Sequence, residues 1–112
     1  METTEILHAM TEPTRFRLLT LLFEHHYCVK ALAKKLDISE PAVSQHMRVL
    51  KKYGIVYGVK LGYQTHYQVS KEKIVFLLND LTERLSHCPP NTEMPSNREC
   101  CCEFISECNK RN

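Results

Sequence analysis

The chain has 112 residues, of which 43% are hydrophobic and 25% charged, and its formal net charge is +2. This size and composition predict a single soluble globular domain with one small core, and the net charge is too small to indicate a nucleic-acid partner by itself. Charged side chains are spread through the first thirty residues, which argues against a secretory signal peptide, and no apolar run reaches the length of a membrane span. We therefore expect a cytoplasmic protein with no membrane contact.

Three helices are predicted in the first third of the chain. Ile6, Leu7 and Met10 share one side of a short amphipathic helix over residues 2–10. Thr11 and Pro13 then open a second helix, which runs from residue 14 to about residue 24 and is apolar around most of its circumference, as expected of a central core helix. A third helix, basic and amphipathic, is predicted over residues 29–36.

A fourth helix follows after only three residues, and its pattern is the clearest in the chain. Ser39 can cap it with its hydroxyl, Pro41 falls in its first turn, and Gly54 supplies a left-handed cap at its end. Apolar residues at spacings of four and three predict a buried stripe, and the residues between them face outward and are small or able to form hydrogen bonds. The stripe is Val43, Met47 and Leu50, and the outward residues are Ala42, Ser44, Gln45, His46 and Arg48.

A β-hairpin is predicted after the fourth helix. Residues 55–61 and 63–69 are rich in β-branched and aromatic side chains and are joined around Gly62. We expect Lys60, Gln64 and His66 to lie near the tip of this hairpin.

The chain is predicted to end in one more helix and a tail. Residues 71 to about 87 return to helical periodicity, and Pro89 and Pro90 end this helix. Residues 91–112 hold too few apolar side chains to build a core of their own. We therefore divide the chain into a domain over residues 1–88 and a cysteine-rich tail over residues 89–112.

This order of elements predicts a mainly α fold with a β-hairpin, the winged helix-turn-helix, in which the fourth helix enters the major groove of DNA. Between residues 30 and 60, seven Lys or Arg residues oppose two acidic ones, whereas residues 93–107 hold four Glu and one Arg. The basic part is therefore the part expected to contact DNA.

The residues of this part suit both kinds of DNA contact. Glutamine can pair with adenine, serine can bond to either base type, and lysines can neutralise phosphates without reading sequence. The hairpin can lie along the phosphate backbone or reach a minor groove, or it can merely cover the core. The candidate DNA-binding residues are Lys34, Lys35, Ser39, Ala42, Ser44, Gln45, His46, Arg48, Lys60 and Gln64.

The segments EPTRFRLLTLL (12–22), VKALAKKLDISEPAVSQHMRVLKKYGIV (29–56) and GYQTHYQVS (62–70) resemble the ArsR/SmtB family of metal-responsive winged-helix repressors. The resemblance covers residues 2–87, and SEPAVSQHM is its most specific part. It implies a homodimer built on the first and last helices, which binds double-stranded operator DNA and releases it when a metal ion or metalloid binds. Ser44, Gln45, His46 and Arg48 match the positions of the family's reading helix.

Two of the effector sites that the resemblance implies are incomplete in this chain. One family site holds zinc with Asp and His ligands on the last helix, but the positions that follow Asp80 in this pattern are Thr82, Glu93 and Ser96. Another family site uses Cys-Val-Cys at the start of the third helix, where this chain keeps only the first thiol, Cys28. We therefore interpret Cys28 as a small apolar residue at a helix start rather than as a ligand.

The tail carries the strongest chemical signal, because Cys100, Cys101, Cys102 and Cys108 lie within nine residues. Three clustered thiolates suit a thiophilic centre such as As(III) or Sb(III), and four suit Zn²⁺ or Cd²⁺. Cys101, Cys102 and Cys108 are similarly arranged to the ligands of arsenical sensors of the family. One straight helix cannot hold all three on one centre, because Cys101 and Cys108 would be about 10 Å apart along its axis. We therefore expect the tail to turn back or to borrow a ligand, and to fold against the last helix when the effector binds.

Two other functions remain open from the sequence. The first is a repressor that senses oxidants or persulfides through a disulfide between Cys28 and Cys88 or between tail cysteines. The second is a zinc-stabilised protein interaction module on the same scaffold, which would leave the chemistry of the reading helix unexplained. An enzyme is not expected, since no cysteine has a suitably placed base.

Overall fold

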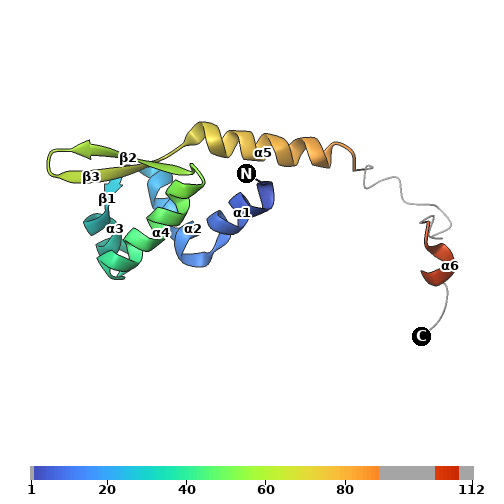
Figure 1. Ribbon diagram of the computed structural model, residues 1–112, viewed down its shortest axis with the longest axis horizontal. Helices are drawn as coiled ribbons and strands as arrows, with labels where there is room; N and C mark the ends of the chain where they lie inside the picture. The colour runs from blue at the N-terminus through green and yellow to red at the C-terminus, as the bar shows by residue number, and fades with distance from the viewer. Residues whose placement is uncertain (1, 89–102, 109–112) are drawn as a thin grey trace.

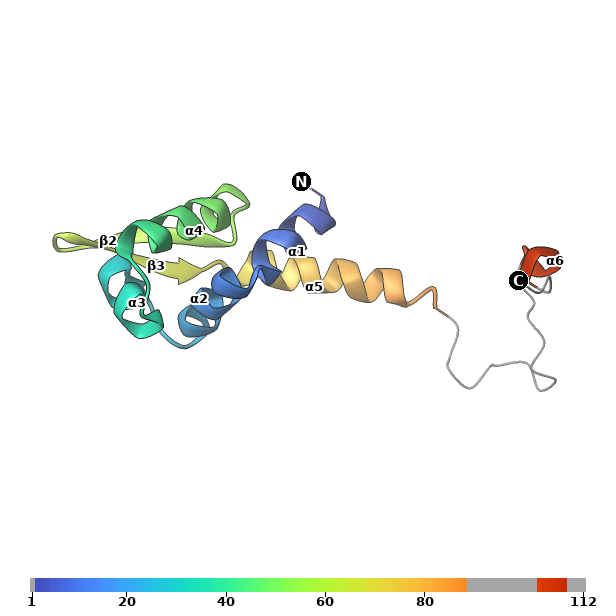
Figure 2. The same ribbon diagram turned by 90° about the horizontal axis from the view of Figure 1, so that it is seen from below.

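The computed structural model describes residues 2–88 and 103–108, and its order of elements confirms the mainly α fold with a β-hairpin (Figure 1). The elements are α1 (Thr3–Thr11), α2 (Pro13–Glu24), β1 (Tyr27–Cys28), α3 (Val29–Leu36), α4 (Glu40–Lys52), β2 (Val56–Leu61), β3 (Gln64–Val69), α5 (Lys71–Leu85) and α6 (Ile105–Cys108). Helices α1 to α4 group beside the hairpin, and α5 runs past α1 and beyond this group (Figures 1 and 2).

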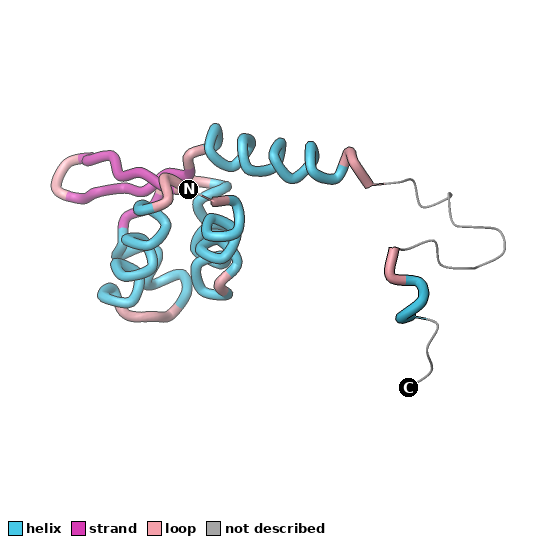
Figure 3. The backbone as a smooth tube through the Cα atoms, turned by 45° about the vertical axis from the view of Figure 1, so that its right-hand side comes forward, coloured by secondary structure: helices cyan, strands magenta, loops and turns pink. Residues whose placement is uncertain are grey.

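The sheet has three strands rather than the predicted two. Its order is β1-β3-β2 and both pairs are antiparallel, so β1 lies against the outer side of the hairpin (Figure 3). Strand β1 was not predicted, because two residues are too few to show the alternation of period two on which a strand prediction rests.

One core is formed by the buried faces of α1 to α5 and the start of the hairpin. The predicted stripe on α4 is confirmed, since Val43 and Leu50 are 0% exposed and Met47 is 1% exposed. The other fully buried large side chains come from α2, α3 and the loop before β2, and they are Leu18, Leu19, Leu32 and Ile55. Close packing of α4 on this core sets the direction in which its outer face points.

Helix α2 is less central than its composition predicted. Leu18, Leu19 and Leu22 are buried, but Phe16 and Phe23 are about half exposed, at 49% and 53%. The two phenylalanines are seven residues apart and therefore share one stripe of the helix. The prediction of a helix buried on most sides was wrong, because in the single chain only one face of α2 meets the core.

The start of α2 also differs from the prediction. Glu12, rather than Thr11, is its N-cap residue, and the Glu12 carboxylate accepts a hydrogen bond from the backbone N–H of Arg15 at 2.9 Å. The Thr11 hydroxyl instead donates to the carbonyl of Leu7 at 2.7 Å, within α1. Pro13 is the first helical residue, where its missing N–H costs no hydrogen bond.

A tight turn joins α3 to α4 and fixes the angle of the helix-turn-helix. Asp37 is left-handed, with φ +54°, and the N–H of Ile38 donates to the carbonyl of Ala33 at 3.1 Å. Asp is one of the few residue types that tolerate this conformation. The end of α4 uses the glycine cap that the sequence predicted, because Gly54 has φ +73° and the N–H of Ile55 donates to the carbonyl of Leu50 at 3.0 Å.

The hairpin is long and largely exposed. Leu61 pairs with Gln64 across a two-residue turn, in which Gly62 has φ +65°, and Lys60 pairs with Thr65. Lys60 and Gln64 therefore lie at the tip, as predicted. His66 does not, because it pairs with Val59 on one side and with Cys28 of β1 on the other, in the body of the sheet.

A methyl group at Gly58 of β2 is expected to destabilise the hairpin. A Cβ at this position would come within 2.8 Å of the Thr65 Cγ2 atom, which is closer than packed carbons approach. Because both residues are exposed, the Thr65 side chain can move aside, and Gly58→Ala should lower the free energy of unfolding by about 0.5 to 1.5 kcal/mol, the cost of an off-rotamer side chain. Urea unfolding at fixed protein concentration measures this change.

The matched control for Gly58→Ala removes the colliding methyl. Thr65→Ser takes away the Cγ2 atom, so the double variant should regain most of the loss. Equal destabilisation in the single and double variants would show that the collision is not the cause.

Candidate nucleic-acid interface

The reading helix α4 is positioned by its first turn and its buried stripe. Ser39 is the N-cap residue, and its hydroxyl oxygen accepts from the backbone N–H of Ala42 at 3.2 Å, as predicted. Pro41 stands in the first turn. Because the helix dipole places a partial positive charge at the N-terminal end of α4, this end favours an anion such as a phosphate.

The outer face of α4 presents polar side chains to solvent. Ser44, Gln45 and Arg48 are exposed, whereas Ala42 and His46 are half-buried. A glutamine amide can bond bidentately to adenine, and a guanidinium can do the same to guanine. The structure thus brings together on one face three of the residues that the sequence singled out.

Lysines flank this face at the ends of two helices. Lys34 and Lys35 lie in the last turn of α3, and Lys51 and Lys52 in the last turn of α4, and all four are exposed. The Lys35 ammonium lies 5.1 Å from the centre of the Tyr27 ring. Within residues 2–88 and 103–108, none of the ion pairs involves these lysines, so their charges remain available to an anionic partner.

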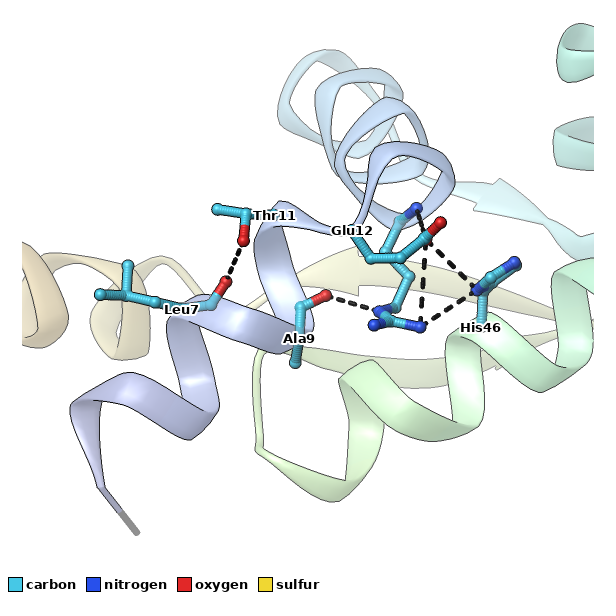
Figure 4. A network of polar contacts seen from close by, with 6 residues as sticks. Leu7, Ala9, Thr11, Glu12 and His46 are labelled. Atoms are coloured by element: carbon cyan, nitrogen blue, oxygen red, sulfur yellow. Dashed lines mark hydrogen bonds and ion pairs between the residues drawn. The ribbon is translucent and has the colours of Figure 1, made fainter.

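A polar network ties the half-buried His46 to the start of α2 (Figure 4). Arg15 Nε donates to the carbonyl of Ala9 at 2.6 Å, and its Nη1 lies 3.4 Å from His46 Nδ1. His46 Nδ1 is also 3.7 Å from the Glu12 carboxylate. A guanidinium can only donate, so in the neutral ring His46 Nδ1 accepts from Arg15 and the ring proton sits on Nε2. In the protonated ring Nδ1–H faces the Glu12 carboxylate instead.

His46 was predicted to face outward, whereas no site role was predicted for Glu12 and Arg15. The network connects the junction of α1 and α2 to the middle of the reading helix, over 31 residues of sequence. Its signal in the sequence is only the Glu-Pro-x-Arg start of α2, which is also what an ordinary capped helix would have. Arg15 therefore contacts both the end of α1 and the middle of α4.

Acidification is expected to weaken this network. The backbone N–H of Arg15 donates to the Glu12 carboxylate and holds the pKa of Glu12 below the ordinary value of 4.5. Partial desolvation raises this pKa, whereas the positive charges of His46 and Arg15 lower it further. The unfolded chain therefore takes up a proton at higher pH than the folded one, and the stabilisation present above about pH 4.5 is lost as the pH falls through the folded pKa.

Glu12→Gln tests this expectation, because the glutamine amide keeps a hydrogen-bond acceptor and removes the charge. The variant should unfold at lower urea concentration at neutral pH, and the difference from the parent should shrink at acid pH. The same substitution at Glu5, an exposed carboxylate of α1, is the control. A difference that does not change with pH would contradict the role of the charge.

The thiols fall into two groups, namely Cys28 and Cys88 of the domain and the four cysteines of the tail. Cys28 is half-buried at the N-cap of α3, where its Sγ accepts from the N–H of Ala31 at 3.4 Å, and Cys88 is exposed just after α5. Cys100, Cys101 and Cys102 lie outside the described residues, and of Cys108 only its place at the end of α6 is described. Among the described residues, no group of three or more His, Cys, Asp or Glu side chains could hold a metal ion.

Asp80 is the one residue of this chain that matches the family's zinc site on the last helix, and its side chain makes contacts within the chain. Its Oδ2 accepts from the Thr3 hydroxyl at 2.5 Å and from Arg84 Nε at 3.2 Å. The Thr3 hydrogen bond, with help from Arg84, holds the pKa of Asp80 below its ordinary value. Asp80 thus anchors α5 to the start of α1.

Comparison with known proteins agrees with this geometry. A family model described as "Bacterial regulatory protein, arsR family" matches residues 12–57, which span α2 to the start of β2. The HTH-type transcriptional repressor SmtB of Mycobacterium tuberculosis is 32% identical over 76 residues, which cover 68% of this chain and 56% of that protein. The chain thus spans less than two thirds of the length of this relative.

Solved structures show the same fold. The crystal structure of a "possible transcriptional regulator for arsenical resistance" is 32% identical, has a TM-score of 0.65, and is matched over 72% of this chain and 84% of that one. The solution structure of a homodimeric winged helix-turn-helix domain from Mycobacterium bovis is 20% identical, with a TM-score of 0.61 over 77% of this chain and 81% of that one. In the described part of the chain, no helix is long and apolar enough to cross a membrane. The sequence matches and the shared fold together place this chain in the ArsR family of bacterial regulatory proteins.

Proposed function

We propose that this protein is a dimeric transcriptional repressor, which acts in the cytoplasm and leaves its operator when thiolates of its tail bind As(III) or Sb(III). The observation that carries the DNA-binding part is the outer face of α4, where Ser44, Gln45 and Arg48 are exposed above a fully buried stripe. The SmtB relative is described as a repressor, which supports the direction of regulation.

The DNA contacts divide between base reading and phosphate binding. Gln45 and Arg48 reach base edges in the major groove, and the small residues Ala42 and Ser44 let α4 approach closely. His46 presents its Nε2–H to the major groove, while its Nδ1 atom stays in contact with Arg15. Phosphates are bound by the end of α4 at Ser39 and by basic or polar side chains around it. These are Lys34 and Lys35 of α3 and Lys60 and Gln64 at the hairpin tip.

The dimer is built on α1 and α5. Leu77 is the one buried residue of α5, a 15-residue helix, in the described chain. Leu78 and Leu85 are 54% and 67% exposed on one side of the helix, and Phe76 is 72% exposed on the opposite side, beside the start of α1. A helix of this length is marginal alone and needs a packed apolar face. A second copy of the chain supplies that face, as in the winged-helix neighbour described as homodimeric.

The effector site belongs to the tail. Cys101, Cys102 and Cys108 supply three soft thiolates for As(III) or Sb(III), and Cys100 adds a fourth that would suit Zn²⁺ or Cd²⁺. The neighbour described as a regulator for arsenical resistance supports the metalloid over the divalent ions. Effector binding folds the tail against α5 and changes the spacing of the two reading helices. A coupling of about 1 to 3 kcal/mol would change DNA affinity roughly 5- to 150-fold.

Operator binding by fluorescence anisotropy at fixed salt tests the proposal. Reduced protein is titrated with As(III), Zn²⁺, Cd²⁺ and peroxide in turn, beside the variant Cys101→Ser/Cys102→Ser/Cys108→Ser. We expect As(III) to release the DNA from the parent but not from the triple variant. Cys28→Ser is the matched control and should respond like the parent, because serine is also a good N-cap.

Each other outcome contradicts a defined part of the proposal. Release by peroxide alone, lost in Cys28→Ser or Cys88→Ser, would replace the metalloid sensor by a thiol redox sensor. Release by As(III) that survives in the triple variant would move the site out of the tail. No binding to DNA under any condition would leave the zinc-stabilised interaction module as the better function.

A further inference from the structure

Two histidines that are far apart in sequence point their Nδ1 atoms at each other. His26 lies between α2 and β1, and His66 lies in the middle of β3. Their Nδ1 atoms are 2.9 Å apart, the ring centres are 4.9 Å apart, and the ring planes are tilted by 60°. Both side chains are half-buried. The proposed binding of DNA and of effector uses neither of them.

Backbone pairing holds this arrangement in place. Tyr27 pairs with Tyr67 and Cys28 pairs with His66 in the antiparallel ladder of β1 and β3. His26 directly precedes β1 and is a diagonal neighbour of His66 across this ladder, a spacing at which long side chains reach each other. The convergence of the two rings is therefore built on main-chain hydrogen bonds rather than on two loose surface side chains.

The contact has the chemistry of a bidentate metal site. In the neutral pair one Nδ1 donates its proton to the lone pair of the other, so both nitrogens are directed at one point between them. Imidazole nitrogens bind Zn²⁺ at about 2.0 to 2.1 Å. Two such bonds at a tetrahedral angle place the nitrogens about 3.3 Å apart, so the rings need to separate by only about 0.4 Å.

We propose that His26 and His66 chelate a divalent cation that prefers imidazole, such as Zn²⁺ or Ni²⁺, through their Nδ1 atoms. On binding, the ring that donated keeps its proton by moving it from Nδ1 to Nε2, so the neutral pair loses no net proton. Imidazole nitrogen is the ligand type that these ions share. The cation ties the corner between α2 and β1 to β3 and so fixes the hairpin relative to the helices.

The two polar side chains next to the pair have partners of their own. The His25 ring centre is 4.2 Å from that of His26, and the His25 Nδ1 atom is engaged by the His26 carbonyl. The Cys28 Sγ atom accepts a hydrogen bond from the backbone N–H of Ala31, so its partner is not one of the two histidines. Neutral imidazole is the form that binds metals.

Water completes the coordination. Among residues 2–88 and 103–108, no third His, Cys, Asp or Glu joins the pair in a group that could hold a metal ion. His26 and His66 both keep part of their surface exposed, which gives water access to the site. A site with two protein ligands and several waters binds more weakly than a closed structural zinc site.

Calorimetric titration with Ni²⁺ tests the site. The tail thiols would bind the same ions, so the full-length, tag-free chain is used with all six cysteines replaced by serine. We expect one Ni²⁺ per chain, with affinity reduced by about tenfold or more in His26→Gln and in His66→Gln, since even loss of a supporting group costs 10- to 100-fold. His8→Gln, an exposed histidine of α1, is the matched control and should bind like the parent.

A second measurement does not depend on substitution at the site. In the same cysteine-free chain, Zn²⁺ should shift the ¹⁵N resonances of Nδ1 in His26 and His66 and leave those of His8 unchanged. Absence of these shifts, or Ni²⁺ binding that is equal in the parent and both glutamine variants, would overturn the proposal. Because no cysteine is present, the result is independent of whether the tail senses a metalloid.

Discussion

Replacing Phe76 with glutamate is expected to convert the protein to a monomer and to weaken operator binding by about 100-fold or more. Phe76 is 72% exposed in the middle of α5, on the surface that we assign to the dimer. Burial of a phenylalanine contributes roughly 1.5 to 3 kcal/mol, and a two-fold axis places each substitution in the interface twice. A buried carboxylate without a partner adds a further cost.

The loss of DNA affinity follows from the loss of the second reading helix. In a dimer the second half-site is bound at high effective concentration, which can raise the total affinity by about 10² to 10⁴. Sedimentation velocity measures the oligomeric state and fluorescence anisotropy the affinity, both at fixed salt.

Phe76→Leu is the matched control for the dimer prediction. It keeps an apolar side chain at the same position and should remain dimeric with nearly unchanged operator affinity. Circular dichroism should show native helix content in both variants. A glutamate variant that is still dimeric and still binds the operator tightly would place the dimer interface elsewhere than on the Phe76 face of α5.

Replacing Leu50 with alanine is expected to lower the free energy of unfolding by about 2 to 5 kcal/mol. Leu50 is 0% exposed and belongs to the stripe that holds α4 on the core. The lost side chain leaves a cavity between packed helices, which adds to the loss of apolar burial. Because typical domains are stable by only 5 to 15 kcal/mol, we also expect a loss of operator binding at elevated temperature.

Leu61→Ala provides the comparison for Leu50. Leu61 is the same residue type but is 47% exposed at the end of β2, so its truncation should cost within about 0.5 kcal/mol. Urea unfolding must be compared at one protein concentration, because the stability of a dimer depends on it. Equal losses at the two positions would contradict the burial of Leu50 in the folded protein.

The reading helix was predictable because its signals are local. Val43 and Met47 recur at helical spacing, and Ser39 and Gly54 each suit the backbone geometry of the helix end at which they stand. Signals of this kind depend on residues within a few positions of each other, so the sequence contains them completely. The prediction failed at Thr11 because threonine and glutamate are both able to cap a helix, and the choice between them depends on how α1 ends.

The exposure of one side of α2 could not be predicted from the sequence. Phe16 and Phe23 are as hydrophobic as the core residues of α2, yet both are about half exposed. Hydrophobicity alone does not say which part of the protein covers a given face of a helix. The pairing of His66 with Cys28 was not predicted, because β1 is too short to be recognised in the sequence.

By itself the sequence determined the order of the helices and the hairpin, the buried face of α4, and the thiol-rich composition of the tail. Only the tertiary structure decided which distant residues meet. Arg15 reaches His46 across 31 residues and His26 reaches His66 across 40. Such contacts leave no periodic signal, because they depend on how buried side chains pack one element against another rather than on spacing along the chain.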